Sequence, residues 1–381
     1  MKLAVGSWQL AVEASRLWVA LALSLGGCSS APTSVPMESE SETPVELGAP
    51  VFDESPIGWA SVADGDTPGT TGGDGGEVVE VTTTADFAMQ VKAAGPRIIL
   101  VNGVIGDNTR LTITSNHTII GLPGAEFHGG LKVSGGVNVI IRNLKIVGNN
   151  CSDSPADCSA GADAVSIGDG AHHIWVDHCD ISDGSDGNLD VNGGADFVTL
   201  SWTKFSYSGL RAGGHQFSNL VGSSDDEPED VGHLRVSYHH DWWADNVHER
   251  MPRVRYGQVH VFNNLYTARG NSYCVGLGVF ANILTESNVF FEVKNPIEST
   301  SYSNDASVIV SRDNLYLESA GSNGDRGTDV FTPPYNYALD AVRDVRPEIE
   351  NGAGVCPSRF VFSATPVPSC VAAEPAAAPS P

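Results

Sequence analysis

The sequence of 381 residues has little positive charge: 21 lysines and arginines stand against 46 acidic residues, which gives a formal net charge of -25. This balance argues against nucleic acid, or an anionic membrane surface, as a general partner, because both carry negative charge. Methionine is also scarce, with 4 residues, whereas glycine is abundant, with 42. Such a composition is more typical of a fold with many strands and turns than of a helical bundle.

The N-terminus lacks an apolar run long enough to span a bilayer, because residues 17–25 are too few for a stable transmembrane helix. This run follows Lys2 and Arg16 and precedes the letters GGCS, and small residues directly before a cysteine resemble a bacterial lipobox. We therefore predict a lipoprotein-type signal peptide over residues 1–28, with Cys28 lipidated. An ordinary signal peptide is the alternative. In both cases the protein leaves the cytoplasm, and the lipid is its one expected membrane contact.

Composition separates a folded body from two flexible segments. Residues 29–76 are rich in Ser, Thr, Pro, Gly and acidic residues, and this composition predicts a disordered linker that cannot bury a core. The tail, residues 371–381, is rich in alanine and proline and is interpreted in the same way. The folded body is therefore expected over residues 77–370.

The sequence has no CxxC and no Cys/His pair at a metal-binding spacing, which argues against a zinc site of that class. Export does permit disulfides. Two pairings close only short loops, Cys151 with Cys158 and Cys356 with Cys370, and these are the predicted bonds. Connectivity does not follow from the sequence itself.

Short alternating segments recur along the body and predict strands. Their first residues lie 35, 24, 38, 23, 24 and 26 positions apart, so a unit of about 24 residues recurs with two longer insertions. A unit of this length without helical periodicity favours a parallel β-helix, an all-β solenoid. A β-sandwich is the alternative. The seven segments begin at Val139, Ile174, Val198, Val236, Val259, Ile283 and Ile309.

Polar residues at equal positions of successive units favour the solenoid over the sandwich. Asn264, Asn288 and Asn314 occupy one such column, where stacked amides can hydrogen-bond as a ladder. A solenoid also needs its open ends covered. We expect the short helix in residues 83–95 to cap the N-terminal end, and residues 337–354 to cover the other.

Three aspartates fall on one side of this solenoid. Asp163 precedes the start of its unit by 11 residues, and Asp186 and Asp190 precede the next start by 12 and 8, so Asp163 should lie one coil below the other two. Crowded carboxylates repel one another unless they are protonated or share a cation. Oxygen ligands suit Ca²⁺, which an exported protein meets. Singly, each could equally be a solvated turn residue.

The arginines of the segment RMPRVR predict a basic wall facing these acids. Arg250 and Arg255 belong in the same column two coils above, at roughly 10 Å for strands about 4.8 Å apart. The intervening coil carries an insertion, residues 207–231, with Arg211 and His215. An acidic polymer would fit between the wall and a bound cation. Ion pairing with the acidic stretch DDEPED is the alternative for one of the three arginines, and it is less plausible for all of them.

Several motifs together resemble family 1 pectate lyases. The resemblance implies a single-stranded right-handed parallel β-helix that cleaves polygalacturonate by calcium-assisted β-elimination, and we expect it to act as a monomer. The motifs are TSNHTIIG (114–121), NVIIRNLKI (138–146), IWVDH (174–178), DFVTLSW (196–202), YHHDWW (238–243), RMPRVRYG (250–257) and VHVFNNLYT (259–267).

The resemblance also implies roles for individual residues. A fourth acid of the family falls on Gly161 and is absent, and the usual lysine falls on Phe217, so that Arg211 or His215 is expected to bind substrate instead. No role is carried over to Arg253. The base would be a guanidine, so activity should rise at alkaline pH. The remaining assignments are Asp163, Asp186 and Asp190 to Ca²⁺, Arg250 to proton abstraction, and Arg255 to the substrate carboxylate.

Three other functions remain compatible with the same pattern of residues. A polygalacturonase would hydrolyse the same polymer with paired carboxylates and would not need calcium. A pectin lyase would act on the methyl ester and would not need the three aspartates. A glycan-binding β-helix without catalysis would create no new chain ends.

Overall fold

The computed structural model describes residues 55–148, 162–211, 214–321 and 323–356. The predicted signal peptide with Cys28, the linker up to residue 54, and the tail lie outside these residues. Of the predicted disulfides, Cys151, Cys158 and Cys370 also lie outside, so both pairings stay predictions. Two described cysteines, Cys179 and Cys274, are buried free thiols. No helix within the described residues is long and apolar enough to cross a membrane.

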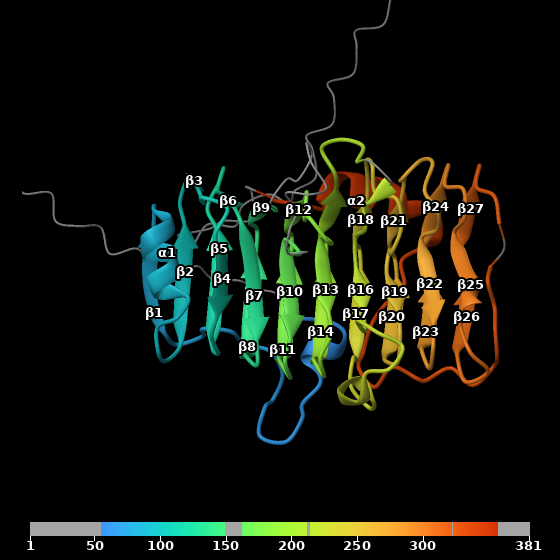
Figure 1. The fold of residues 1–381 in the computed structure, drawn as a ribbon, viewed down its shortest axis with the longest axis horizontal. Helices are drawn as coiled ribbons and strands as arrows, with labels where there is room; N and C mark the ends of the chain where they lie inside the picture. The colour runs from blue at the N-terminus through green and yellow to red at the C-terminus, as the bar shows by residue number, and fades with distance from the viewer. Residues whose placement is uncertain (1–54, 149–161, 212–213, 322, 357–381) are drawn as a thin grey trace, which may run out of the picture. The chain divides into compact units, whose positions relative to one another are not determined.

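The chain winds through three parallel sheets in turn, so that each coil contributes a strand to each sheet (Figure 1). This is the expected parallel β-helix. The ten-stranded sheet contains β1 (Glu77–Val81), β2 (Arg97–Val101), β5 (His117–Gly121), β8 (Val137–Arg142), β11 (His172–Asp177), β14 (Asp196–Ser201), β17 (Val236–His239), β20 (Gln258–Phe262), β23 (Asn282–Glu286) and β26 (Val308–Arg312).

The other two sheets use shorter strands. The eight-stranded sheet contains β4 (Arg110–Ile113), β7 (Gly130–Ser134), β10 (Val165–Gly168), β13 (Leu189–Val191), β16 (Leu220–Val221), β19 (Arg253–Val254), β22 (Val275–Gly278) and β25 (Ile297–Tyr302). The nine-stranded sheet contains β3 (Val104–Ile105), β6 (Glu126–His128), β9 (Lys145–Val147), β12 (Asp180–Ser182), β15 (Lys204–Ser206), β18 (Trp242–Trp243), β21 (Leu265–Tyr266), β24 (Val289–Phe291) and β27 (Leu315–Leu317).

The predicted repeat is confirmed in register. Ile174 lies opposite both Val139 and Val198 in the ten-stranded sheet, and each later unit start faces the next in the same way. The reason is the period of two along each strand: these positions point inward, and a slip by one residue would expose the apolar set. The core is therefore one continuous column of Val, Ile and Leu.

The predicted asparagine ladder is also present. Asn264 Nδ2 donates to Asn288 Oδ1 at 2.9 Å, and Asn288 Nδ2 donates to Asn314 Oδ1 at 2.9 Å. The same amides bond to backbone groups of neighbouring strands, for example Asn288 Nδ2 to the Val261 carbonyl. The ladder thus satisfies buried polar groups where the chain turns out of the ten-stranded sheet.

Helix α1 (Thr84–Gln90) lies at the N-terminal end of the solenoid, as expected for a cap (Figure 1). Thr83 caps it by accepting from the Asp86 amide, and Phe87 is fully buried in the core. The chain before β1 differs from the linker expectation over residues 55–76. Here the 3-10 helix η1 (Trp59–Ser61) packs on the ten-stranded sheet, with Trp59 buried and its amide bonded to Ser237.

The C-terminal part corrects a second expectation, because residues 337–354 cover a side of the solenoid and not its end. Helix α2 (Val342–Gly352) packs on β21 and β24, with Val345 and Ile349 buried against the nine-stranded sheet. Three stacked strands offer a much larger apolar face to an amphipathic helix than one terminal coil does. The short 3-10 helix η3 (Pro228–Asp230) lies in the insertion before β17.

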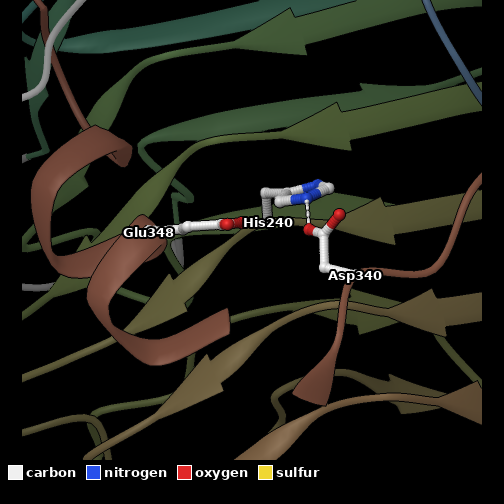
Figure 2. A group of neighbouring side chains, drawn as sticks. All are labelled: His240, Asp340 and Glu348. Atoms are coloured by element: carbon white, nitrogen blue, oxygen red, sulfur yellow. Dashed lines mark hydrogen bonds and ion pairs between the residues drawn. The ribbon is translucent and has the colours of Figure 1, made fainter. Parts of the chain in front are cut away.

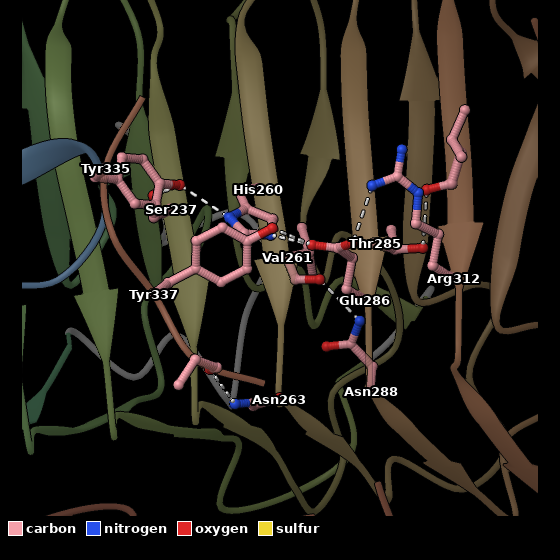
Figure 3. A network of polar contacts seen from close by, with 12 residues as sticks. Ser237, His260, Val261, Asn263, Thr285, Glu286, Asn288, Arg312, Tyr335 and Tyr337 are labelled. Atoms are coloured by element: carbon pink, nitrogen blue, oxygen red, sulfur yellow. Dashed lines mark hydrogen bonds and ion pairs between the residues drawn. The ribbon is translucent and has the colours of Figure 1, made fainter. Parts of the chain in front are cut away.

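Residues 331–341, here called the C-terminal strap, lie along the ten-stranded sheet before α2 begins. Figure 3 shows its two tyrosines above this sheet. The Tyr335 hydroxyl bonds to Ser237 and to His260, and the Tyr337 hydroxyl donates to Glu286 at 2.7 Å. Polar side chains on the outer face of the sheet therefore hold the strap in place.

Candidate active site

Two of the three predicted calcium ligands, Asp163 and Asp190, lie together beside the eight-stranded sheet, and Asp186 lies at the edge. Asp190 is on β13 and faces Ser166 of β10, and Asp163 directly precedes β10. Gly187 leaves room between them: a Cβ there would lie 2.8 Å from Asp190 Oδ1 and 3.1 Å from Asp163 Oδ1. The two carboxylates therefore face the same small space, which the coil spacing predicted.

Hydrogen bonds leave this acidic pair incompletely satisfied. Asp190 Oδ1 accepts from the Leu220 amide at 2.9 Å, whereas Asp163 Oδ1 is buried and has no partner. Burial, followed by the charges of Asp190 and Asp186, raises the pKa of Asp163. Burial also raises the pKa of Asp190, against the Leu220 amide and Arg250, which lower it.

Asp186 lies at the edge of this space and is more exposed. Its carboxylate is 3.4 Å from His215 Nε2, and its side chain is 46% exposed. Within the described residues, the three aspartates do not bring one oxygen each to within 4.8 Å of one another. The exposed Asp186 side chain is the one that can swing inward to complete a set of three.

Arg250 is where the sequence expected it, on the approach to β19 and two coils from β13. Its backbone has φ of 64°, a left-handed conformation that is uncommon outside glycine. Its guanidinium carbon lies 4.1 Å from the centre of the Phe217 ring, and its Nε is buried without a partner. The guanidinium charge also lowers the pKa of Asp190, so the two groups interact across the candidate site, which is called the groove below.

The other two arginines of the segment have partners of different kinds. Arg255 donates from Nε to Asp225 at 2.5 Å and from Nη1 to the Gly222 carbonyl at 2.9 Å. The ion-pair alternative is therefore observed for one arginine, with Asp225 of the DDEPED stretch as its partner. Arg253 stacks on Tyr302 at 3.9 Å, and burial, followed by the charge of Arg255, lowers its pKa.

Arg211 and His215, expected to replace the usual lysine, lie in different surroundings. Arg211 donates to the backbone carbonyls of Gly184 and Asp183 at 2.6 and 3.0 Å, and stacks on Tyr207. It thereby holds the turn that leads to Asp186. His215 faces that carboxylate directly, and its ring lies 4.2 Å from the Phe217 ring.

Sequence reasoning missed the central place of Phe217. Its ring contacts both Arg250 and His215, so one aromatic side chain joins the basic wall to the acidic side. The sequence carried one signal of this, since an aromatic residue stands where the family has a lysine. The Asp225 partner of Arg255 had no comparable signal, because the path of the insertion is irregular.

The residues present fit a hard cation. Two buried carboxylates with raised pKa values, and one buried oxygen with no partner, are unfavourable unless a positive ion or protons neutralise them. The ligand atoms are oxygens, which suit Ca²⁺.

The chain is similar to several known proteins. A pectate trisaccharide-lyase of Thermotoga maritima is 38% identical over 222 residues, which are 57% of this chain and 58% of that protein. One from Thermotoga sp. is 33% identical over 349 residues, 82% of this chain and 91% of that protein. The crystal structure of a pectate lyase from Bacillus sp. N165, in complex with trigalacturonate, matches with a TM-score of 0.65 and 26% identity, over 79% of this chain and 99% of that chain. The family model described as pectate lyase matches residues 48–358, so the chain belongs to the pectate lyase family.

Proposed function

We propose that this protein is a calcium-dependent pectate lyase that cleaves polygalacturonate by β-elimination. One observation carries the proposal: a partly unsatisfied group of carboxylates lies opposite Arg250, which is two coils away and acts electrostatically on Asp190. The family membership and the trigalacturonate in the related Bacillus structure support the substrate class.

Asp163, Asp186 and Asp190 would hold the calcium ion. When bound, Ca²⁺ would neutralise the substrate carboxylate and stabilise the negative charge that develops as the proton on the adjacent carbon leaves. The side chain of Asp186 would turn from His215 toward the ion. His215 would then be free to contact the sugar.

In its neutral form, Arg250 would take the proton from C5 of the galacturonate ring. The C–H electron pair becomes the C4–C5 double bond, the C4–O4 bond breaks with its electron pair on O4, and O4 takes a proton from solvent. Stacking on Phe217 fixes the guanidinium plane, and its Nε is buried. Both features favour a single orientation toward the substrate.

Arg255 would release Asp225 and bind the substrate carboxylate in its place. The side chain of Asp225 is 60% exposed, so it can turn into solvent when a carboxylate of the polymer arrives. A bidentate guanidinium suits either carboxylate. Arg211 would act through the turn that carries Asp186, and so would affect binding indirectly.

We further propose export, with the chain held at a membrane surface through lipidated Cys28 and acting as a monomer. The lipobox-like letters before Cys28 and the composition of residues 29–54 motivate this proposal. Mass spectrometry of the native mature N-terminus tests it. A free, unmodified N-terminus downstream of Cys28 would leave simple secretion.

The central experiment follows the ultraviolet absorbance of unsaturated chain ends on polygalacturonate, with and without a calcium chelator. We expect absorbance to rise only with calcium, and only weakly with methyl-esterified pectin. Reducing ends that form without absorbance would indicate a hydrolase, and preference for the ester would indicate a pectin lyase. No new ends at all would indicate a non-catalytic glycan-binding protein.

The variant Asp186→Ala separates cation binding from folding. It should weaken calcium binding and activity together while leaving the β-sheet circular dichroism signal unchanged. An unchanged calcium titration in this variant contradicts the assignment of Asp186.

A further inference from the structure

A second group of polar side chains lies away from the groove, where the C-terminal strap meets α2. His240 comes from the turn between β17 and β18, Asp340 from the strap, and Glu348 from α2 (Figure 2). One donor atom from each lies within 4.8 Å of the other two. Among the described residues, this is the one group of three His, Cys, Asp or Glu side chains with that spacing.

The left-handed turn after the ten-stranded sheet fixes the His240 ring. The backbone of His240 has φ of 57°, and the ring stacks on Trp202 of the coil below at 4.3 Å, with an interplanar angle of 15°. Trp202 occupies the same turn position with φ of 49°. A ring held by stacking has few rotamers, so His240 Nε2 stays directed at Asp340, 2.7 Å away.

The neighbouring His239 contacts the other nitrogen of the His240 ring. The two Nδ1 atoms are 3.0 Å apart, so one of them donates. His239 is itself buried and stacks on Phe262 at 5.0 Å. The Nδ1 side of His240 is therefore occupied, and Nε2 is the nitrogen that faces Asp340.

Two carboxylates that face each other beside a histidine nitrogen are favourable only when a proton or a metal ion lies among them. Asp340 also accepts from Asn263 at 3.2 Å, which orients its carboxylate. Glu348 interacts with that carboxylate, and this raises the pKa of Glu348 after the effect of burial. Among the ion pairs of the described residues, neither acid has a lysine or arginine partner; Asp340 pairs with His240 alone.

We propose that His240, Asp340 and Glu348 bind a divalent transition-metal ion of the Zn²⁺ class. One imidazole nitrogen and two carboxylate oxygens are ligands that Zn²⁺ takes in proteins, and water can supply a fourth. The nitrogen ligand distinguishes this site from the oxygen-only acids of the groove, which suit Ca²⁺. The contact of His240 Nδ1 with His239 Nδ1, at 3.0 Å, is of the kind that orients a metal-binding imidazole.

The ion would join three segments that are distant in sequence. His240 belongs to the solenoid, whereas Asp340 and Glu348 belong to the strap and to α2. A metal here would hold the C-terminal covering against the solenoid, and it would act on stability and not on the lyase reaction. Because the ligands are 100 and 8 residues apart, no short motif in the sequence announces the site.

The test compares the full-length wild-type protein with Glu348→Gln and Glu350→Gln, all in saturating Ca²⁺ so that the groove is filled. Glu350 is the matched control, because it lies on the same helix but pairs with Arg346 at 2.8 Å. Zn²⁺ is titrated against a chromophoric chelator, and the thermal midpoint is measured with and without Zn²⁺. Calcium-dependent lyase activity serves as the check of folding and should be equal in all three proteins.

We expect the wild type and Glu350→Gln to bind one Zn²⁺ and to gain thermal stability from it, as ligand linkage requires. Glu348→Gln should bind that ion at least about tenfold more weakly and should gain correspondingly less. Equal Zn²⁺ affinity and equal stabilisation in all three proteins would overturn the proposal. Absence of Zn²⁺ binding by the wild type would also overturn it, and would mean that a proton on His240 holds the group together.

Discussion

At the scale of single residues, the candidate site departs from the family pattern at one position. Phe217 stands where the resemblance places a lysine, and its ring lies 4.1 Å from the guanidinium carbon of Arg250. A partly desolvated guanidinium over an aromatic face is stabilised by about 1–2 kcal/mol. Two of the basic side chains that would face the substrate, Arg250 and His215, therefore contact Phe217, and the ring fixes where the first of them lies.

Replacement of Arg250 by lysine should abolish most of the reaction while leaving substrate binding largely intact. Lysine keeps the charge but loses the planar fork and its stacking on Phe217. Loss of a general base typically lowers kcat by about 10²–10⁴-fold. Steady-state kinetics on polygalacturonate measure kcat and KM separately. Arg253→Lys is the control, because Arg253 stacks on Tyr302 and has no assigned role in the reaction. If Arg253→Lys lost most of its kcat while Arg250→Lys kept a near-normal kcat, Arg250 would not be the base.

Replacement of Phe217 by leucine should lower kcat/KM about tenfold, since the lost cation–π contact is worth about 1.4 kcal/mol. Leucine remains apolar, so the change isolates the ring face. Phe217→Tyr keeps that face and should retain most of the activity. Equal activity of the leucine and tyrosine variants would mean that Phe217 only fills space.

At the scale of elements, regular features were predictable and irregular ones were not. The seven strand starts and the Asn264 column follow from a period of two within strands and about 24 between coils, and both are observed. The side position of α2 depends on the apolar face made by β21 and β24, which no local pattern describes. For the same reason the Asp225 partner of Arg255, carried by an aperiodic insertion, stayed one alternative among several.

The asparagine ladder makes a prediction about stability alone. Asn288→Ala would leave the Asn264 amide and the Val261 carbonyl without partners in the core, at a cost of about 1–3 kcal/mol. Asn314→Ala, at the less buried end of the ladder, should cost less. Chemical denaturation measures both, and specific activity of the folded protein should not change. Equal losses for the two variants would show that the ladder contributes no more than local packing.

At the scale of the whole molecule, the protein combines a net charge of -25 with carboxylates that the fold itself keeps from ionising easily. This net negative charge would repel an acidic polymer, so on the function proposed above binding would depend on the local arginines and on a cation at the aspartates. Calcium would then serve twice, for the affinity of the candidate site and for the stability of the folded state at neutral pH. The second need follows from proton linkage and is open to measurement.

Without calcium, the folded protein should lose stability as pH rises from about 4 to 9. An unfolded aspartate has a pKa of about 3.9. In the fold, burial together with neighbouring acids raises the pKa of Asp163 to about 9, and burial raises that of Asp190 to about 7. Between these values the folded state binds more protons than the unfolded state, so the free energy of unfolding falls with pH, by up to roughly 1.4 kcal/mol per pH unit for each group.

Calcium should reverse this trend, because the ion replaces the protons and its binding strengthens as the carboxylates ionise. We expect calcium to raise the thermal midpoint more at pH 8.5 than at pH 6. The variant Asp163→Asn removes the group with the highest pKa and should flatten the pH dependence of the metal-free protein. Two results without calcium would mean that these carboxylates ionise freely. The thermal midpoint of the wild type could stay constant as the pH rises from 6 to 8.5, or it could decrease by the same amount in the wild type and in Asp163→Asn. The groove would then be solvated by water, and calcium would not be required to hold it together.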